Sequence, residues 1–211
     1  QAGGELRDST LRDNATHGVA LQGEARPTLR GNSVTGNAKF GMSFTEDSAG
    51  TAVGNTVTGN GVHGIGVAGR AAPELADNSV RENDENGLTY TGEGGGLARG
   101  NRLEANSGHG VALFERAAPE LRRNSVTKNG QVGLFYARRS AGHAVGNAVN
   151  ANGGHGVVVQ DDARPELEGN RVRDNDQSGI AYFGRAQGWA RGNRCESNGL
   201  HGLSVAGAAR P

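Results

Sequence analysis

Four side chains capable of acid–base or stacking chemistry follow one another at intervals of 23 residues. They are Glu120, His143, Glu166 and Trp189. Three charged residues lie two positions after members of this series, namely Arg122, Glu168 and Arg191. A histidine between two carboxylates can transfer protons on a sugar chain, and an indole ring can stack against a sugar ring. These residues form one site only if 23 residues is the repeat of the fold.

The whole chain follows a 23-residue repeat without an insertion or deletion. Nine consecutive repeats span residues 2–24, 25–47, 48–70, 71–93, 94–116, 117–139, 140–162, 163–185 and 186–208. Asn occupies the eighth position in eight repeats and the thirteenth in all nine, and Gly occupies the seventeenth in all nine. The tenth, eighteenth and twentieth positions are apolar, and no stretch has helical spacing. Each repeat therefore predicts three short strands separated by Asn and Gly turns.

The composition agrees with a stacked coil of such strands. The 211 residues include 37 Gly, and only 34% are hydrophobic and 4% aromatic, too few for an ordinary globular core. Rungs stacked about 4.8 Å apart need only a narrow core and place equivalent residues over one another. Asn side chains can then bond along the stack. We expect one all-β domain, a parallel β-solenoid of nine 23-residue rungs with no long loops, about 43 Å long.

The repeat resembles that of right-handed parallel β-helix proteins. The motif N-x-V-x-x-N-x-x-x-G-I-x-V is carried by the stretch from Asn55 to Val67. The resemblance covers the whole chain and is to the carbohydrate-binding and sugar-hydrolase type of repeat, within the pectate-lyase-like superfamily. It implies a right-handed β-helix. It does not imply one activity, because that family includes polysaccharide lyases, epimerases, hydrolases, adhesins and interaction scaffolds.

The series that ends at Trp189 is predicted to lie on the outer face of one sheet. If the protein is an enzyme, a lyase, epimerase or glycoside hydrolase acting on an acidic polysaccharide, its catalytic residues are Glu120, His143 and Glu166. The predicted ligand-binding residues are Trp189, Arg122, Glu168 and Arg191. The alternative is a solvated ladder of opposite charges that stabilises the sheet.

The regularity of the repeat favours a protein without catalytic activity. No rung carries an insertion, and no cluster of Asp exceeds the pair Asp161–Asp162. We therefore expect a non-catalytic binding or scaffold module for a polysaccharide or protein partner, with the enzyme as the alternative. A rigid arm that binds no ligand is a third hypothesis.

A second column carries histidine in every other rung. Its members are His17, His63, His109, His155 and His201. Successive members would lie about 9.6 Å apart, too far to share a zinc ion. We expect corner histidines that bond to the backbone or to a tyrosine of an adjacent rung, and a pH-sensitive or ligand-facing stripe remains the alternative. The sequence predicts neither a metal site nor a cofactor.

Three further surface patterns bear on partners. The twenty-third position carries mostly alternating acidic and basic residues from Glu24 to Arg185, which predicts a charge ladder. The nineteenth position is small or apolar and is expected to point outward, so it would make a poor catalytic floor. A basic group could meet an acidic polymer: Arg122, Arg123, Lys128, Arg138 and Arg139.

Charge and apolar content limit the classes of partner. The 22 Lys and Arg balance the 22 Asp and Glu, which argues against nucleic acid as a partner. No apolar run approaches about 18 residues, so membrane insertion is not expected. The chain begins at Gln1 and reads as a piece of a larger protein, and an extracellular or cell-surface location is favoured. Open strand edges at the two ends predict end-to-end self-association.

Overall fold

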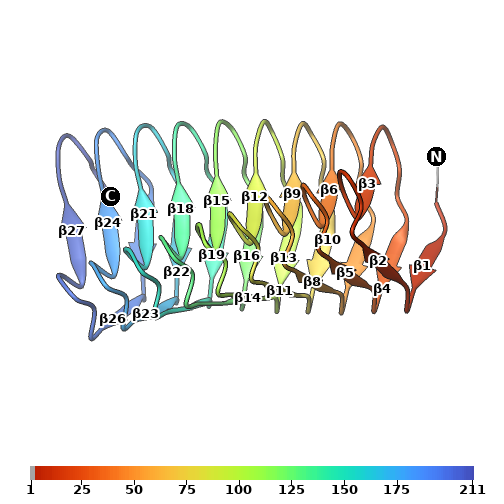
Figure 1. Cartoon of the computed structure of the whole chain (residues 1–211). Coiled ribbons are helices and arrows are strands. Elements are labelled where there is room, and N and C mark those ends of the chain that lie inside the picture. Colours follow the sequence, from red (N-terminus) through yellow and green to blue (C-terminus); the bar gives the residue numbers. More distant parts are fainter. Residues whose placement is uncertain (1–2) are drawn as a thin grey trace.

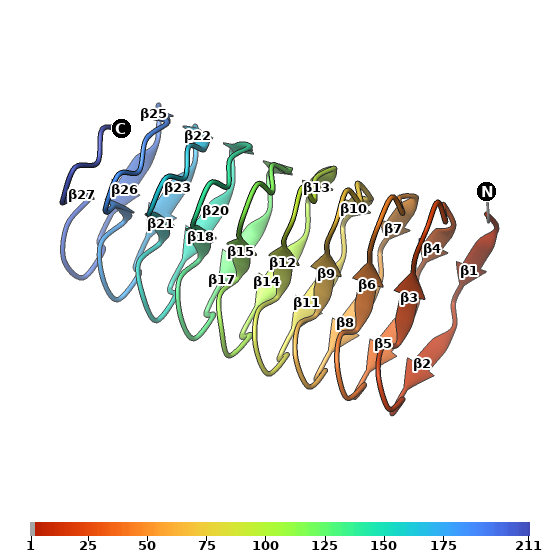
Figure 2. The same cartoon turned by 90° about the horizontal axis from the view of Figure 1, so that it is seen from above.

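The chain forms one straight stack of rungs, with its two ends at opposite ends of the stack (Figures 1 and 2). The computed structural model describes residues 3–211. This part of the chain contains 27 strands of three residues each, arranged as three parallel nine-stranded sheets that run along the stack. Each rung contributes one strand to each sheet, which gives the molecule three flat faces.

The three sheets are designated A, B and C in the order in which the chain meets them. Sheet A contains β1 (Glu5–Arg7), β4 (Thr28–Arg30), β7 (Thr51–Val53), β10 (Glu74–Ala76), β13 (Leu97–Arg99), β16 (Glu120–Arg122), β19 (His143–Val145), β22 (Glu166–Glu168) and β25 (Trp189–Arg191). Sheet B contains β2 (Thr10–Arg12), β5 (Ser33–Thr35), β8 (Thr56–Thr58), β11 (Ser79–Arg81), β14 (Arg102–Glu104), β17 (Ser125–Thr127), β20 (Ala148–Asn150), β23 (Arg171–Arg173) and β26 (Arg194–Glu196). Sheet C contains β3 (Val19–Leu21), β6 (Met42–Phe44), β9 (Ile65–Val67), β12 (Leu88–Tyr90), β15 (Val111–Leu113), β18 (Leu134–Tyr136), β21 (Val157–Val159), β24 (Ile180–Tyr182) and β27 (Leu203–Val205).

Every strand pairs with its equivalent 23 residues further along, without an offset. In sheet A, for example, Glu120 pairs with His143 and His143 pairs with Glu166. The register is the same in sheets B and C, where Val126 pairs with Val149 and Leu134 with Val157. The predicted all-β parallel solenoid of 23-residue rungs is therefore confirmed, and equivalent residues lie in straight columns along the molecule.

The core is narrow and is filled by a few inward columns. Leu75, Leu121 and Leu167 from sheet A are fully buried, as are the valines and the leucine at the tenth position of the repeat in sheet B from Val34 to Val172. The largest buried side chains come from sheet C in every other rung, at Phe44, Tyr90, Tyr136 and Tyr182. The intervening rungs carry smaller residues at this position, so large and small layers alternate and fill the tube.

Two ladders of buried asparagine side chains brace the corners. In each ladder the Nδ2 of one asparagine donates to the Oδ1 of the asparagine 23 residues later, as Asn124 does to Asn147 at 3.0 Å and Asn147 does to Asn170 at 3.0 Å. The same Oδ1 also accepts the backbone N–H of the preceding asparagine. The side-chain N–H groups further bond to carbonyls, such as that of Leu121 at 2.9 Å. These bonds satisfy polar groups that burial would otherwise leave unpaired.

The glycine at the seventeenth position is required by close packing. A Cβ atom at Gly110 would overlap Cγ1 of Val126 and lie 2.8 Å from the carbonyl oxygen of Gly133. The equivalent glycines Gly18, Gly41, Gly64, Gly133 and Gly156 face the same three kinds of neighbour, and Gly87 faces the asparagine and the glycine carbonyl. The side chain is absent here because the ladder asparagine and the core valine fill the corner.

The last rung has no neighbour on its outer side. Leu203 and Val205 are 56% and 48% exposed there, whereas their equivalents in the inner rungs are buried. End-to-end self-association through such a surface stays a prediction. Within residues 3–211 there is no helix of the length and apolarity needed to cross a membrane.

The asparagine ladders predict a large and position-specific cost of substitution. Asn147→Ala removes the acceptor of two buried N–H groups of Asn124 and the side-chain donor to the carbonyl of Leu121. We expect a loss of about 3 kcal/mol in the free energy of unfolding, measured by urea denaturation.

Asn150→Ala is the matched control, since Asn150 lies three residues away in the same rung. The Oδ1 of Asn150 is buried without a hydrogen-bond partner in the structure, so its removal is expected to cost less than about 1 kcal/mol. Equal losses in the two variants would contradict the assigned role of the ladder.

Candidate functional site

Sheet A brings the predicted site residues together in one column. Strands β16, β19, β22 and β25 place Glu120, His143, Glu166 and Trp189 side by side in register on the outer face. Because neighbouring strands are about 4.8 Å apart, each side chain reaches the next. The sequence prediction that these four residues share one face is borne out by the strand register.

His143 and Glu166 form the closest acid–base pair of this column. The Nδ1 atom of His143 lies 2.8 Å from Oε2 of Glu166. The histidine side chain is 56% exposed, so the rest of its ring faces solvent. A neutral imidazole that donates from Nδ1 to a carboxylate keeps the lone pair of Nε2 free to accept a proton. The pair therefore has the arrangement of a histidine base held by a carboxylate.

Glu120 is engaged by a different partner. Its Oε1 accepts a hydrogen bond of 2.5 Å from Nε of Arg122, in the same strand. Two carboxylates flank His143 along the column, but the structure pairs the histidine with Glu166 alone. The sequence placed Glu120 and Glu166 in equivalent roles, and the bond to Arg122 distinguishes them.

Trp189, Glu168 and Arg191 form a second cluster next to this pair. Nη2 of Arg191 donates to Oε1 of Glu168 at 2.6 Å, and this bond raises the pKa of the arginine above its usual value. The guanidinium carbon lies 5.7 Å from the centre of the Trp189 ring, within the range of a cation–π contact. The indole is 39% exposed and presents a flat surface beside the candidate site.

A groove of about 720 Å³ lies at the corner between sheets A and B. Of the site residues, Arg122 and Glu168 line it, whereas His143, Glu166 and Trp189 lie on the face of sheet A outside its lining. Arg99, Arg122 and Arg123 line one part of it and Glu168 lines another. Its floor is low because Gly146 and Gly169 adopt left-handed backbone conformations, with φ of 64° and 61°, and carry no side chain. Larger residues at these two turns would fill the groove.

The charges of the groove are only partly neutralised by neighbours. Arg99 bonds to Glu74 at 2.8 Å, and Arg122 bonds to Glu120. Arg123 is exposed, and the ion pairs found in residues 3–211 do not include it. The sequence analysis did not identify Arg99 or the glycines that form the floor of the groove. Arginines next to glycines at equivalent positions of adjacent rungs could have indicated it.

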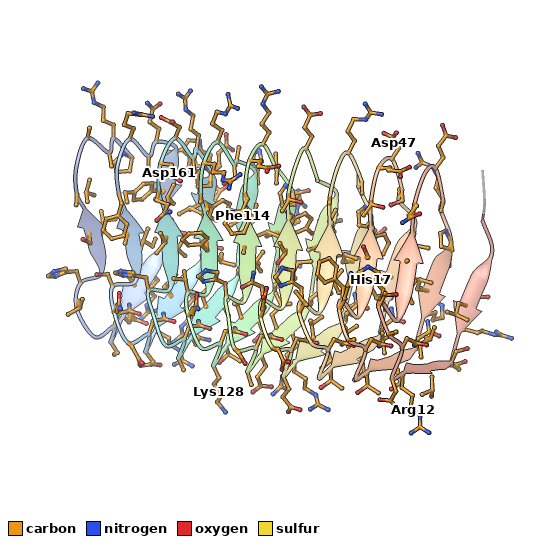
Figure 3. All side chains as sticks on the ribbon, turned by 45° about the horizontal axis from the view of Figure 1, so that its top comes forward. Arg12, His17, Asp47, Phe114, Lys128 and Asp161 are labelled. Carbon is orange, nitrogen blue, oxygen red and sulfur yellow. The ribbon has the colours of Figure 1, made fainter. Side chains whose placement is uncertain are left out.

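The basic group predicted from the sequence is wrong as a single cluster. The structure divides its members among three separate hollows, because the turns of the rung carry them to different corners. Arg122 and Arg123 line the groove beside sheet A, whereas Lys128 lies with Arg81 and Glu104 beside sheet B. Arg138 and Arg139 lie at the third corner with Glu93 and Glu115. Figure 3 shows Lys128 and Arg12 along one long edge of the molecule, and Asp47 and Asp161 along the opposite edge.

The twenty-third position forms the expected charge ladder. Arg70 makes two hydrogen bonds of 2.7 Å to Asp47, and Arg185 makes two of 2.8 Å to Asp162. In both pairs the bonded arginine lowers the pKa of the aspartate. These pairs lie at the surface with their arginines largely exposed, so they stabilise neighbouring rungs only weakly.

The nineteenth position points outward from sheet C as expected, but most of its side chains in the inner rungs are buried. Ala112 and Ala181 are inaccessible to solvent. Aromatic side chains from the adjacent corner cover the face: a Cβ atom at Gly66 would lie 2.9 Å from the ring of Phe40. Small residues are therefore needed at this position to make room for an outer layer of side chains.

The histidine column lies in this outer layer at the corner between sheets B and C. His17, His63, His109 and His155 each accept a backbone N–H of the next rung through Nδ1. The expectation of a bond to the backbone is confirmed. His201 is exposed in the last rung. Among residues 3–211 no group of three or more His, Cys, Asp or Glu side chains is arranged to hold a metal ion.

The sequence matches the model of the right handed beta helix region over residues 1–149 and 114–210, and the chain therefore belongs to this family. No curated protein matches the chain in sequence.

Solved structures with a similar fold include three proteins. The mannuronan C-5 epimerase AlgE4 A-module of Azotobacter vinelandii superposes with a TM-score of 0.67 at 15% identity, over 98% of this chain and 56% of that one. The periplasmic alginate epimerase AlgG gives 0.60 at 19% identity, over 97% and 46%. Pectate lyase Pel9A gives 0.53 at 11% identity, over 97% and 70%. The chain thus spans about half of the epimerase structures, and the likeness is one of fold.

Proposed function

We propose that this protein acts on an acidic polysaccharide, which it binds along the groove beside sheet A, with His143 as the proton-transferring base. The observation that carries the proposal is the His143–Glu166 pair on strands β19 and β22, whose last residues Val145 and Glu168 line a groove that also contains three arginines. The fold shared with alginate and mannuronan epimerases and a pectate lyase supports a uronate polymer as the ligand. This favours the enzyme hypothesis over the non-catalytic module that the regular repeat first suggested.

The groove offers complementary charge to a uronate ring. The guanidinium groups of Arg122 and Arg123 can bind the sugar carboxylate, because arginine matches a carboxylate with two parallel N–H donors. Glu168 and the carboxylate of Asp77, which also line the groove, can accept bonds from sugar hydroxyls. Trp189 offers its exposed ring to a neighbouring sugar. Sugars of one chain would then lie along the stack of rungs.

Neutralising the sugar carboxylate makes the proton on the adjacent carbon easier to remove. In the proposed step the C-5–H bond breaks, the proton passes to Nε2 of His143 and the electron pair moves into the carboxylate. Glu166 holds Nδ1–H of the ring and stabilises the imidazolium that forms. In epimerisation a solvent water gives a proton to the opposite face of C-5, and His143 returns its own proton to solvent. In cleavage the bond from C-4 to its oxygen substituent breaks, that oxygen takes the proton from Nε2 of His143, and a C-4–C-5 double bond is left.

A non-catalytic binding module is the second candidate. It is favoured by the bond that joins Glu120 to Arg122 and by a groove that no insertion covers. The two functions predict the same ligand and differ in turnover. A location outside the cytoplasm follows from either, since acidic polysaccharides of this kind surround cells.

Substitutions in the acid–base pair are predicted to abolish turnover while sparing binding. With uronate polysaccharides as substrates, His143→Gln is expected to lower kcat by about 10²-fold or more. Glu166→Gln is expected to lower kcat with little change in affinity, because it acts through the histidine. Products are measured as new reducing ends, unsaturated sugars and changed C-5 configuration. Glu5→Gln, in the same column at the far end of sheet A, is the control and should be fully active.

The ligand class is tested by following Trp189, the one tryptophan of the chain. Titration with a uronate polysaccharide is expected to change its fluorescence with saturation, and a neutral polysaccharide is not. Arg123→Gln should weaken binding about tenfold, equal to about 1.4 kcal/mol, and added salt should weaken it further. Arg12→Gln, on sheet B, should leave it unchanged. Binding without product would support the second candidate, and the absence of both would refute the two together.

A further inference from the structure

The histidine column forms an outer layer with aromatic side chains, separate from the hydrophobic core. Phe40 lies between His17 and His63: its ring is tilted by 51° against that of His17 at 5.1 Å and stacks on that of His63 at 5.0 Å, both between ring centres. His109 stacks in parallel on Phe135 at 4.5 Å. Figure 3 shows His17 and Phe114 on this side of the molecule. The layer covers the outward face of sheet C and closes the corner where sheet B turns into sheet C.

Each histidine of this layer holds the next rung through a bond that requires a neutral ring. Four backbone N–H groups donate to histidine Nδ1 atoms: Phe40 to His17 at 3.3 Å, Asn86 to His63 at 3.3 Å, Val132 to His109 at 3.2 Å and Ser178 to His155 at 3.0 Å. A nitrogen accepts a hydrogen bond only while its lone pair is free. Protonation at Nδ1 would place two N–H groups against each other and break the bond.

In one of the rungs without histidine, the same position of the repeat carries a hydrogen-bond acceptor that does not titrate. Asn86 replaces histidine there, and its Oδ1 accepts the N–H of His109 at 2.8 Å. An amide oxygen therefore makes the bond that Nδ1 makes in the rungs with histidine. The chain thus contains its own example of a variant without a titrating group.

Burial keeps the histidines neutral. It lowers the pKa of His17, His63 and His155, and it lowers that of His109 to about 4. Lys39 near His17 acts in the same direction, whereas Glu85, whose Oε2 lies 3.2 Å from Nδ1 of His63, acts against it. Asp84 and Glu85 also line the hollow beside His109.

We propose that the histidine column is a proton-operated latch, which closes the corner between sheets B and C when neutral and releases it when protonated. Release frees the four backbone N–H groups and uncovers the apolar residues at the nineteenth position, among them Ala112 and Val158. The latch does not involve His143 and is independent of the proposed activity.

The direction of the pH effect follows from the lowered pKa values. The folded protein binds fewer protons at these sites than the unfolded chain, whose histidines have a pKa of about 6.5. The stabilisation is therefore complete above this pH and is lost as the pH falls towards the folded-state value, about 4 for His109. As the pH falls through this window, each such histidine raises the unfolding equilibrium constant by up to about tenfold per pH unit.

The test compares the wild-type chain with a variant in which His17, His63, His109 and His155 are all replaced by Asn. Urea denaturation at pH 8 and pH 5 gives the unfolding constant at each pH. The carboxylates are the same in both proteins, and Glu85 is the one that contacts a replaced histidine, His63, so the difference reports the four histidines together with this pair. His109→Asn alone is expected to remove about a thirtyfold rise in the unfolding constant between these pH values. If the unfolding constant depends equally on pH in the wild type and in the fourfold variant, the proposal is overturned.

A second measurement uses the unmodified protein, so the proposal stays testable if the fourfold variant does not fold. NMR titration of the histidine C2 protons gives the four pKa values directly, and hydrogen exchange gives the protection of the amides of Phe40, Asn86, Val132 and Ser178. We expect pKa values below 6.5, and each amide should lose protection as the pH falls through the pKa of the histidine that it bonds, which is about 4 for His109 and the amide of Val132. Values at or above 6.5, or unchanged protection, overturn the proposal.

Discussion

The structure depends on hydrogen bonding between identical positions of successive rungs. The backbone ladder of each sheet and the two asparagine ladders share one spacing, about 4.8 Å, and one register. An extra residue inside a strand would break this register, whereas a turn could accommodate one at the surface. The small apolar content follows from the narrow interior that such a stack encloses.

The same constraint shapes the candidate site. Residues that are far apart in the chain, such as Glu120 and Glu166, are held two rungs apart on a rigid sheet, and a flexible loop is not needed to bring them together. The columns also repeat side chains at a regular spacing along the molecule, so several sugars of one polymer could each meet a side chain. A groove that runs parallel to the stack suits a linear ligand better than a small molecule, because its lining continues from rung to rung.

The columns of the fold could be predicted from the sequence because each position repeats. The placement of Glu120, His143, Glu166 and Trp189 on one face needed only the register. The pairing within the face could not be predicted, since the choice of Glu120 between His143 and Arg122 depends on side-chain conformation. The groove was missed because it is formed by absent side chains at Gly146 and Gly169. The burial of the nineteenth position was missed because aromatic residues of another turn cover it.

Exchange of the C-5 proton of a uronate sugar tests the central claim most directly. The protein is incubated with a uronate polysaccharide in D₂O, and the sugar is analysed by NMR for deuterium at C-5. The proposed proton transfer through His143 predicts deuterium in the product or in recovered substrate, and its loss in the His143→Gln variant. Saturable binding with no deuterium at C-5 would contradict the claim and leave the protein as a binding module.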